Sequence, residues 1–140
     1  MQPNHWGPNL WRSIHYIALG YPGAADPETR AAYIAFYRNL WYVIPCLKCA
    51  VNYRRHIDAE MPPIEGFMDS GKSLFEWTVA LHNLVNRELG KREWTVEEAL
   101  EHYTKEPKVV TEKKYLTYMS ALFVALVILL GLFAMQRVRS

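Results

Sequence analysis

Apolar side chains recur at intervals of three and four over most of residues 9–103. No segment in this part alternates apolar and polar positions for long enough to predict a strand. The pattern therefore predicts an all-α fold with five helices, and a core of modest size. The expected helices cover about 9–19, 26–40, 45–60, 70–89 and 95–103. The fourth has the most regular apolar face, made by Leu74, Trp77, Leu81, Val85 and Leu89.

Residues that start and stop helices support these boundaries. Asp26 followed by Pro27 is typical of a helix start. Thr95 with Glu98 three residues later is the sequence pattern of a capping box, which opens the short fifth helix. Gly90 stands where a left-handed residue commonly ends a helix such as the fourth.

A different pattern follows the helical region. Residues 116–135 contain no charged side chain, a length that lets a helix cross the roughly 30 Å hydrocarbon core of a bilayer. We expect a membrane-spanning helix here, and the alternative is a buried core helix. The predicted organisation is a helical domain at 1–107, a charged linker at 108–115, the membrane helix at 116–135 and a basic tail at 136–140.

The placement of the helical domain is inferred from the two ends of the sequence. The N-terminal stretch MQPNHWGPNLW has the pattern of neither a secretory signal nor a transit peptide, so we expect no cleaved targeting sequence. Basic residues flank both ends of the apolar segment, and the positive-inside rule therefore does not set its orientation. Because few residues follow that segment, we expect a tail anchor with the helical domain on the cytosolic side.

Composition excludes two classes of function. The formal charge of the 140 residues is only +2, and basic residues are mixed with acidic ones, so we expect no nucleic-acid partner. The chain has two cysteines, which are too few for the disulfide scaffold of a small secreted protein. Hydrophobic packing must therefore hold the fold together.

The two cysteines, Cys46 and Cys49, form a C-x-x-C pair that follows Pro45 at the start of the third predicted helix. At this position the first sulfur lies near unpaired amide groups and the positive end of the helix dipole, which favour a thiolate. The spacing also lets the two sulfurs form and break a disulfide without refolding. The pair is thus a candidate redox centre.

Two other interpretations of the pair stay open. A zinc site needs four ligands, and the chain has no second C-x-x-C and no H-x-x-x-H, although a mixed site with two of the scattered histidines fits the composition. Those histidines are His5, His15, His56, His82 and His102. An inert pair of small buried residues is the second alternative. We expect no metal.

Three stretches, taken together, resemble the Erv/ALR family of FAD-linked sulfhydryl oxidases, in the compact form encoded by large cytoplasmic DNA viruses. They are HWGPNLWRSIH from His5, the P-C-x-x-C motif from Pro45, and WTVALHNLVNRELGK from Trp77. The resemblance covers most of residues 5–103. It implies a four-helix bundle with a short fifth helix, non-covalent FAD at the mouth of the bundle, and a homodimer.

The resemblance also implies a set of cofactor contacts. These are Gly7, Trp11, His15, His82, Asn83, Val85, Asn86, Lys91 and Tyr103. Their chemistry suits FAD, because the rings offer flat faces, the amides offer hydrogen bonds and the lysine offers a cation to the pyrophosphate. Trp77 is expected to be a core residue instead.

The implied reaction is the oxidation of a protein dithiol. A substrate thiolate attacks the disulfide at Cys46, Cys49 lies next to the flavin ring, and FAD passes two electrons to O2 to give H2O2. Anchored in a cellular or virion membrane, the domain would form disulfides in membrane proteins on the reducing cytosolic side. Two alternatives differ in class: a tail-anchored zinc-binding adaptor, and a membrane scaffold without catalysis.

Several positions depart from the family pattern. Val79 and Val96 stand where many members join the fourth and fifth helices by a disulfide, so we expect an apolar contact there. Ile44 replaces the aromatic residue often found before P-C-x-x-C. The chain has no further cysteines for a shuttle arm, and so the resemblance implies a separate carrier, a thioredoxin-like or C-x-x-C protein.

Overall fold

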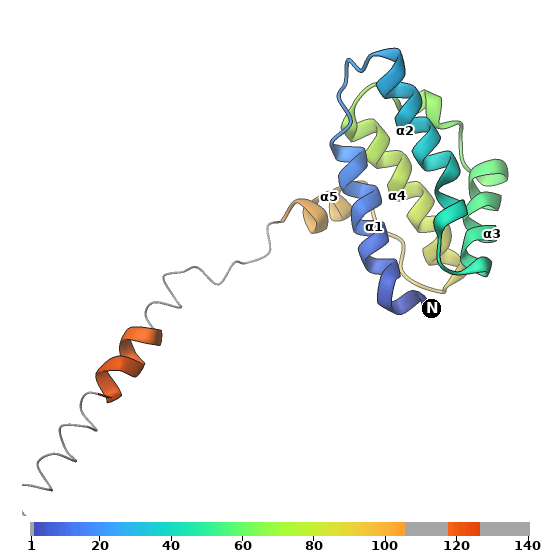
Figure 1. The fold of residues 1–140 in the computed structure, drawn as a ribbon. Coiled ribbons are helices and arrows are strands. Elements are labelled where there is room, and N and C mark those ends of the chain that lie inside the picture. The colour runs from blue at the N-terminus through green and yellow to red at the C-terminus, as the bar shows by residue number, and fades with distance from the viewer. Residues whose placement is uncertain (1, 106–117, 127–140) are drawn as a thin grey trace, which may run out of the picture. The chain divides into compact units, whose positions relative to one another are not determined.

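The computed structural model describes residues 2–105 and 118–126. It divides into two units, Met1–Lys105 and Glu106–Ser140. All regular elements in the described residues are helical, which confirms the predicted all-α class (Figure 1). The α-helices of the first unit are α1 (Pro3–Leu19), α2 (Pro27–Asn39), α3 (Leu47–Arg55), α4 (Gly71–Glu88) and α5 (Val96–Thr104).

The first helix begins earlier than the sequence pattern predicts. It starts at Pro3 rather than near Asn9, and Pro8 lies inside it. Proline at the first position costs nothing, because the missing N–H has no helical partner there, whereas Pro8 removes one bond of the ladder. The extension brings Trp6 and Gly7 onto the same helix as Trp11.

The other boundaries agree with the sequence pattern, with short irregular turns at the ends. A 3-10 turn, Leu40–Val43, follows α2, and a π-helical turn, His56–Glu60, extends α3. A further 3-10 turn, Ile64–Phe67, precedes α4. The capping box of α5 is confirmed, since Thr95 Oγ1 accepts from Glu98 N at 3.1 Å and Glu98 Oε2 accepts from Thr95 N at 3.0 Å.

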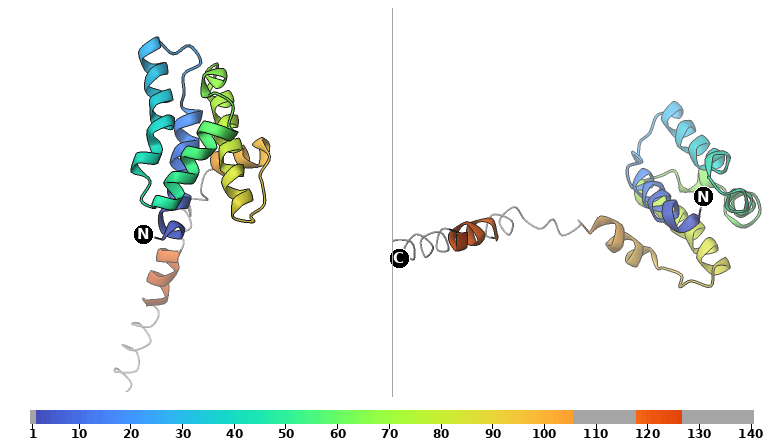
Figure 2. Two further views of the ribbon diagram at one scale, coloured as in Figure 1. Left: turned by 90° about the vertical axis from the view of Figure 1, so that its right-hand side faces the viewer. Right: turned by 60° about the horizontal axis from the view of Figure 1, so that its bottom comes forward.

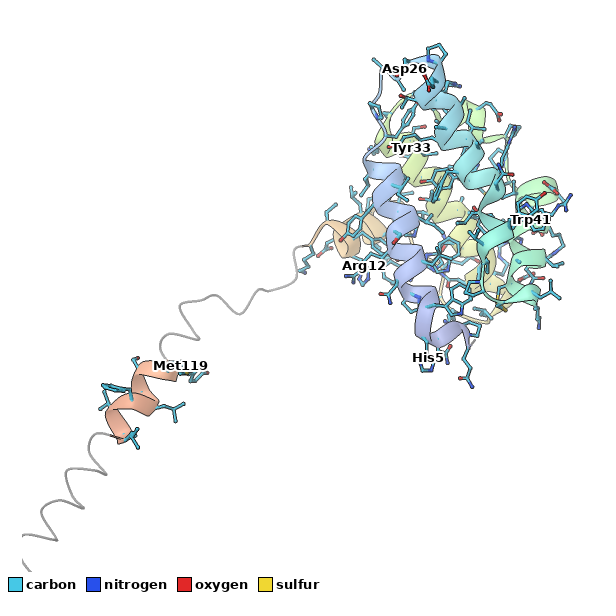
Figure 3. The ribbon with its side chains drawn as sticks, in the orientation of Figure 1. His5, Arg12, Asp26, Tyr33, Trp41 and Met119 are labelled. Atoms are coloured by element: carbon cyan, nitrogen blue, oxygen red, sulfur yellow. A yellow bond between two sulfur atoms is a disulfide. The ribbon has the colours of Figure 1, made fainter. Side chains whose placement is uncertain are left out.

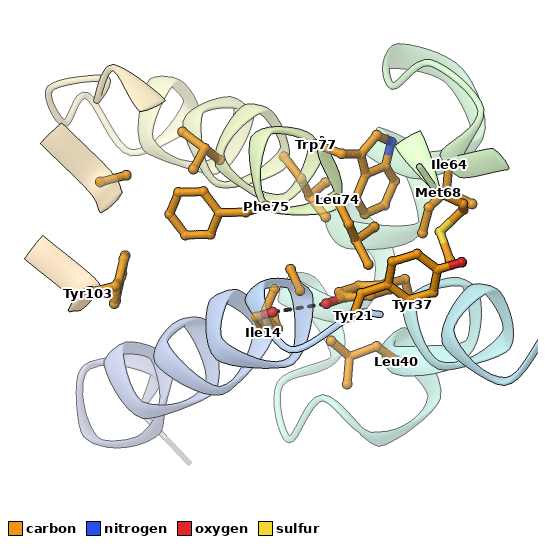
Figure 4. Close-up of a cluster of buried hydrophobic side chains, with 14 of the residues drawn as sticks. Ile14, Tyr21, Tyr37, Leu40, Ile64, Met68, Leu74, Phe75, Trp77 and Tyr103 are labelled. Atoms are coloured by element: carbon orange, nitrogen blue, oxygen red, sulfur yellow. Dashed lines mark hydrogen bonds between the residues drawn. The ribbon is translucent and has the colours of Figure 1, made fainter. Parts of the chain in front are cut away.

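The core lies between α1, α2 and α4 (Figures 2 and 4), and α5 contacts both α1 and α4. Buried tyrosines tie the helices together at this point. Tyr37 on α2 donates to the carbonyl of Ile14 on α1 at 2.9 Å, and Tyr53 on α3 donates to the carbonyl of Tyr37 at 2.9 Å. Burial raises the pKa of both phenols well above its usual value, so both remain donors.

Three residues singled out in the sequence belong to this core. Trp77 is 1% exposed and donates its indole N–H to the carbonyl of Pro62, which confirms its structural role. Val79 is 3% exposed, and Val96 is partly buried against the same cluster. Both valines thus pack in the same hydrophobic core.

In the second unit, residues 118–126 are helical. The remaining parts of the predicted membrane segment at 116–135, and the whole of the predicted linker at 108–115 and tail at 136–140, lie outside the described residues. Among the residues that are described, no helix has both the length and the apolar character needed to span a bilayer.

Candidate active site

A cavity of about 510 Å³ lies at the end of the bundle where α1, α3, α4 and α5 meet. Its volume is in the range of small-molecule and cofactor sites. Nine of the predicted site residues line it: Gly7, Trp11, Cys46, Cys49, His82, Val85, Asn86, Lys91 and Tyr103. Residues separated by most of the domain's sequence are therefore brought to one place by the fold.

The cysteine pair forms one wall of the cavity. Cys46 and Cys49 are joined by a disulfide, and their Cα atoms are 5.2 Å apart. Cys46 is the N-cap of α3, and its Sγ accepts a hydrogen bond from the amide of Cys49 at 3.3 Å. Both cysteines are half-buried, and Ile44 lines the cavity next to them. The pair is thus oxidised at a helix start, as the redox interpretation requires.

The surface beside the disulfide carries positive charge and aromatic rings. Lys48 lines the cavity one residue before Cys49. The guanidinium of Arg54, on the helix that follows the cysteine motif, lies 4.6 Å from the ring centroid of Trp41, which is labelled in Figure 3. Trp41 in turn packs on Tyr42, whose side chain is 69% exposed.

A stack of flat rings forms another wall. The imidazole of His82 lies parallel to the indole of Trp11, with 4.0 Å between centroids and 5° between planes. His15 lies behind them, fully buried, and its Nε2 is 3.1 Å from Nδ1 of His82. Tyr103 of α5 packs against His15 with 4.5 Å between centroids.

Both stacked histidines are held in the neutral form. Burial, together with the nearby His82 and His102, lowers the pKa of His15 to about 3. Burial, together with the positive charge of Lys91, lowers the pKa of His82 to about 4. At neutral pH His82 in the cavity wall and His15 behind it are therefore both uncharged.

Two of the predicted contacts do not line the cavity. His15 forms the layer behind the wall, and Asn83 faces the loop between α4 and α5. The amide of Asn83 donates to the carbonyl of Trp94 at 2.8 Å and accepts from its N–H at 2.9 Å. Asn83 therefore fixes the loop, and its role as a direct cofactor contact stays a prediction.

The structure adds residues that the sequence analysis did not assign to the site. Trp6 lines the cavity, and its indole Nε1 is buried without a hydrogen-bond partner among the described residues. The spacing of Trp6 four residues before Leu10 was an available signal, because both lie on one helical face. Other lining residues missed were Arg12, Asn52, Tyr53, Glu88 and His102.

The unsatisfied groups fit a large, planar, anionic cofactor. The Nε1 of Trp6 is a buried donor without a partner among the described residues, and Asn86, which is 6% exposed, adds an amide to the cavity lining. A buried polar group without a partner is costly, which favours a ligand that supplies one. Arg12, Lys48 and Lys91 provide cations for phosphate groups.

Comparison with known proteins agrees with this arrangement. A probable FAD-linked sulfhydryl oxidase of Acanthamoeba polyphaga mimivirus is 36% identical over 118 residues, which is 84% of this chain and 80% of that protein. A putative FAD-linked sulfhydryl oxidase of Invertebrate iridescent virus 6 is 33% identical over 95 residues, which is 65% of this chain and 85% of that protein.

Solved structures share the fold. The core of yeast Erv1 has a TM-score of 0.66 and 20% identity to this chain, and the match covers 77% of this chain and 88% of that one. The FAD binding domain of Erv1 from Saccharomyces cerevisiae gives the same TM-score of 0.66 with 21% identity. A sequence profile described as the Erv1 / Alr family matches residues 8–107. The resemblance drawn from the three motifs is thus confirmed, and the chain belongs to the Erv1/Alr family.

Proposed function

We propose that this protein is an FAD-linked sulfhydryl oxidase that forms disulfides in protein dithiols. The observation that carries the proposal is the position of the Cys46–Cys49 disulfide, which lies in the wall of a cavity whose unsatisfied polar groups and cations fit FAD. The two viral relatives described above carry the names of a probable and a putative FAD-linked sulfhydryl oxidase, which supports the same activity. A zinc-binding adaptor would need both sulfurs as free thiolates, whereas here the two sulfurs are joined in a disulfide.

The residues that would hold FAD follow from the chemistry of the wall. Trp11, His82 and Tyr103 offer ring faces, Val85 and Ile44 offer apolar contacts, and Gly7 leaves room beside α1. Lys91 and Arg12 would pair with the pyrophosphate, and Asn86 and Trp6 would bind polar groups of the cofactor. When bound, FAD supplies the acceptor for two electrons and passes them to O2, which becomes H2O2.

The protein's own sulfurs carry the exchange chemistry. A substrate thiolate attacks Sγ of Cys46, the Cys46–Cys49 bond breaks, and Cys49 leaves as a thiolate. The second thiolate of the substrate then attacks the substrate's own sulfur in the mixed disulfide. This step releases Cys46 as a thiolate and the substrate as a disulfide. The amide of Cys49, 3.3 Å from Cys46 Sγ, and the start of α3 stabilise the thiolate that forms at Cys46. We assign exchange to Cys46 and electron donation to Cys49.

Two measurements on the purified full chain test this function. The visible spectrum should show flavin bands, and oxygen consumption with dithiothreitol should yield one H2O2 per oxidised dithiol. Cys46→Ser and Cys49→Ser should each abolish turnover while the flavin bands remain. Bound zinc without flavin would favour the adaptor, and turnover that survives the loss of either sulfur would refute the proposed exchange.

We also propose that electrons enter from a separate dithiol protein, since Cys46 and Cys49 are the only cysteines in the sequence. A thioredoxin-like or other C-x-x-C carrier is the chemical class expected. Reduced thioredoxin should be oxidised by the full chain, and a thioredoxin variant that lacks its resolving cysteine should attack the Cys46–Cys49 disulfide and accumulate as a mixed disulfide at Cys46. Absence of both effects would point to another class of thiol donor.

The assembly and the membrane attachment are further proposals. A homodimer is inferred from family membership, and sedimentation of the purified protein tests it. The uncharged stretch at residues 116–135 supports a membrane anchor for the domain at 1–107, with the domain on the cytosolic side of a cellular or virion membrane. Synthesis in the presence of microsomes should give a carbonate-resistant protein, and lysine substitutions within 116–135 should release it.

A further inference from the structure

The buried hydroxyl of Thr78 sets a direction for the hydrogen bonds behind the cavity. Thr78 is 0% exposed, and its Oγ1 lies 2.7 Å from the carbonyl oxygen of Phe75 one turn earlier on α4. A carbonyl oxygen can only accept, so the single hydroxyl hydrogen is donated to Phe75. The remaining lone pairs of Thr78 Oγ1 are therefore available only as acceptors.

The direction of the Thr78 hydrogen bond determines which nitrogen of His15 carries the hydrogen. Nδ1 of His15 lies 2.9 Å from Thr78 Oγ1, and it must carry the hydrogen of that bond because Thr78 has none left to donate. The imidazole is neutral, since burial lowers its pKa to about 3, and a neutral imidazole carries only one N–H. Nε2 of His15 is therefore an acceptor.

The same reasoning extends to His82. Its Nδ1 lies 3.1 Å from Nε2 of His15, so it must donate. His82 is also neutral, and its second nitrogen, Nε2, therefore has no hydrogen. This Nε2 has no hydrogen-bond partner within residues 2–105, while the ring lines the cavity and is fixed by its stack on Trp11.

The reverse direction is unfavourable on geometric grounds. If Thr78 donated to His15, its oxygen and the carbonyl oxygen of Phe75 would face each other at 2.7 Å with no hydrogen between them. Two buried oxygens at this distance repel unless one donates. The arrangement of Phe75, Thr78, His15 and His82 thus has one consistent set of hydrogen positions.

We propose that Thr78 and His15 are positioning residues that fix His82 as its Nδ1–H tautomer, so that Nε2 of His82 faces the cofactor as an acceptor. This inference rests on the proposed function, because it takes FAD as the occupant of the cavity. The part of FAD opposite Nε2 must then be an N–H or O–H donor. Such donors are the imide N–H of the flavin ring, the adenine amino group and the sugar hydroxyls.

Nitrogen-15 NMR of the histidine-labelled full chain, as purified, tests the tautomer directly. The signals of His82 are assigned by their loss in His82→Asn. Wild-type His82 should show a protonated, pyrrole-like Nδ1 and an unprotonated, pyridine-like Nε2. A protonated Nε2 on His82 would overturn the proposal. If the purified protein contains no flavin, the proposed function fails, but the tautomer can still be determined from the same spectrum.

Two substitutions at Thr78 separate positioning from packing. Thr78→Val keeps the shape and removes the hydroxyl, so His82 should become a mixture of tautomers and FAD should bind about tenfold more weakly. Thr78→Ser keeps the hydroxyl and should retain both the tautomer and the FAD affinity within about twofold. A wild-type tautomer or an unchanged FAD affinity in a folded Thr78→Val protein contradicts the positioning role. If Thr78→Val does not fold, a changed tautomer in Thr78→Ser would contradict it instead.

Discussion

The side-chain amide of Asn52, on the helix that carries the cysteines, donates to the carboxylate of Glu88 at 2.9 Å. Glu88 ends α4, the helix that carries His82, so this bond joins the two sides of the cavity. The same carboxylate contacts Arg55, and Nε2 of the buried His56 lies 3.4 Å from it. Glu88 therefore holds the sulfur-bearing helix in place beside the ring-bearing helix.

Replacing Glu88 should weaken both the fold and the cavity. In Glu88→Ala, Asn52 and Arg55 each lose a partner, and we expect the free energy of unfolding to fall by about 1–2 kcal/mol. FAD should also dissociate faster, because α3 is held less firmly against α4. Urea unfolding and flavin release measure the two effects.

A matched control is Glu101→Ala, which removes an exposed carboxylate paired with Lys105 at 3.3 Å. Such exposed pairs contribute little, so unfolding should change by less than about 0.5 kcal/mol and flavin release should not change. Equal effects of Glu88→Ala and Glu101→Ala would show that the carboxylate does not join the helices.

Stability should depend on pH through the two neutral histidines. The unfolded chain binds protons at His15 and His82 near pH 6.5, whereas the folded chain does so only near pH 3 and pH 4. Below pH 6.5 the unfolded state therefore holds more protons, and stability falls as pH decreases toward 4. Each histidine contributes a slope of up to about 1.4 kcal/mol per pH unit.

Unfolding by urea at several values between about pH 7.5 and pH 5 measures this slope, and this range lies above that of most carboxylates. His15→Gln should reduce the slope by the share of one histidine, even if it also lowers stability overall. His5→Gln, at an exposed residue of α1, should leave the slope unchanged. A slope that is the same in His15→Gln and wild type would contradict the assignment.

Asn83 should act on the fold rather than by contact with the cofactor. Asn83→Ala removes both bonds to the backbone of Trp94, so we expect a loss of about 2 kcal/mol in unfolding free energy. FAD affinity should fall only slightly, and only because the loop that carries Lys91 is displaced. Asn39→Ala, at an exposed asparagine whose side chain caps no turn, is the control for asparagine loss in general. A large loss of FAD affinity without loss of stability would instead make Asn83 a direct contact.

The sequence pattern predicted the helices more completely than it predicted the candidate site. The spacing of apolar residues predicted α4 and its end at Gly90, because a long amphipathic helix with a left-handed cap has a clear pattern, and Gly90 has φ of +63°. The start of α1 was placed too late, near residue 9, whereas the helix begins at Pro3 and continues through Pro8 with the loss of only one ladder bond.

The motifs in the sequence were enough to predict which residues gather at the candidate site. They were not enough to predict which of these residues line the cavity and which lie behind its wall. Spacing places His82 and Asn86 on one helical face, but it does not tell which residues lie in the cavity wall and which lie behind it. Thr78 was missed although it lies four residues before His82 on that face, because a buried threonine gives no signal until its partners are known. Asn83 was assigned to the cofactor from the family resemblance, and its two hydrogen bonds to the backbone of Trp94 depend on the fold of the loop after α4, which the spacing of residues does not give.

Two substitutions at Gly7 should distinguish an effect on the space for the cofactor from an effect on the stability of α1. A Cβ at Gly7 would meet no atom within 4 Å, and the residue lines the cavity from inside α1. Gly7→Ala should therefore stabilise the helix by about 0.5–1 kcal/mol, since glycine is a poor helix former. Gly7→Phe places a ring in the space assigned to FAD and should weaken FAD binding at least tenfold while the domain stays folded. Gly66→Phe, at an exposed glycine whose Cβ would also meet nothing within 4 Å, is the control and should retain flavin. If Gly7→Phe keeps its flavin, the cofactor does not occupy the space beside α1, and the wall formed by Trp11 and His82 would need another ligand.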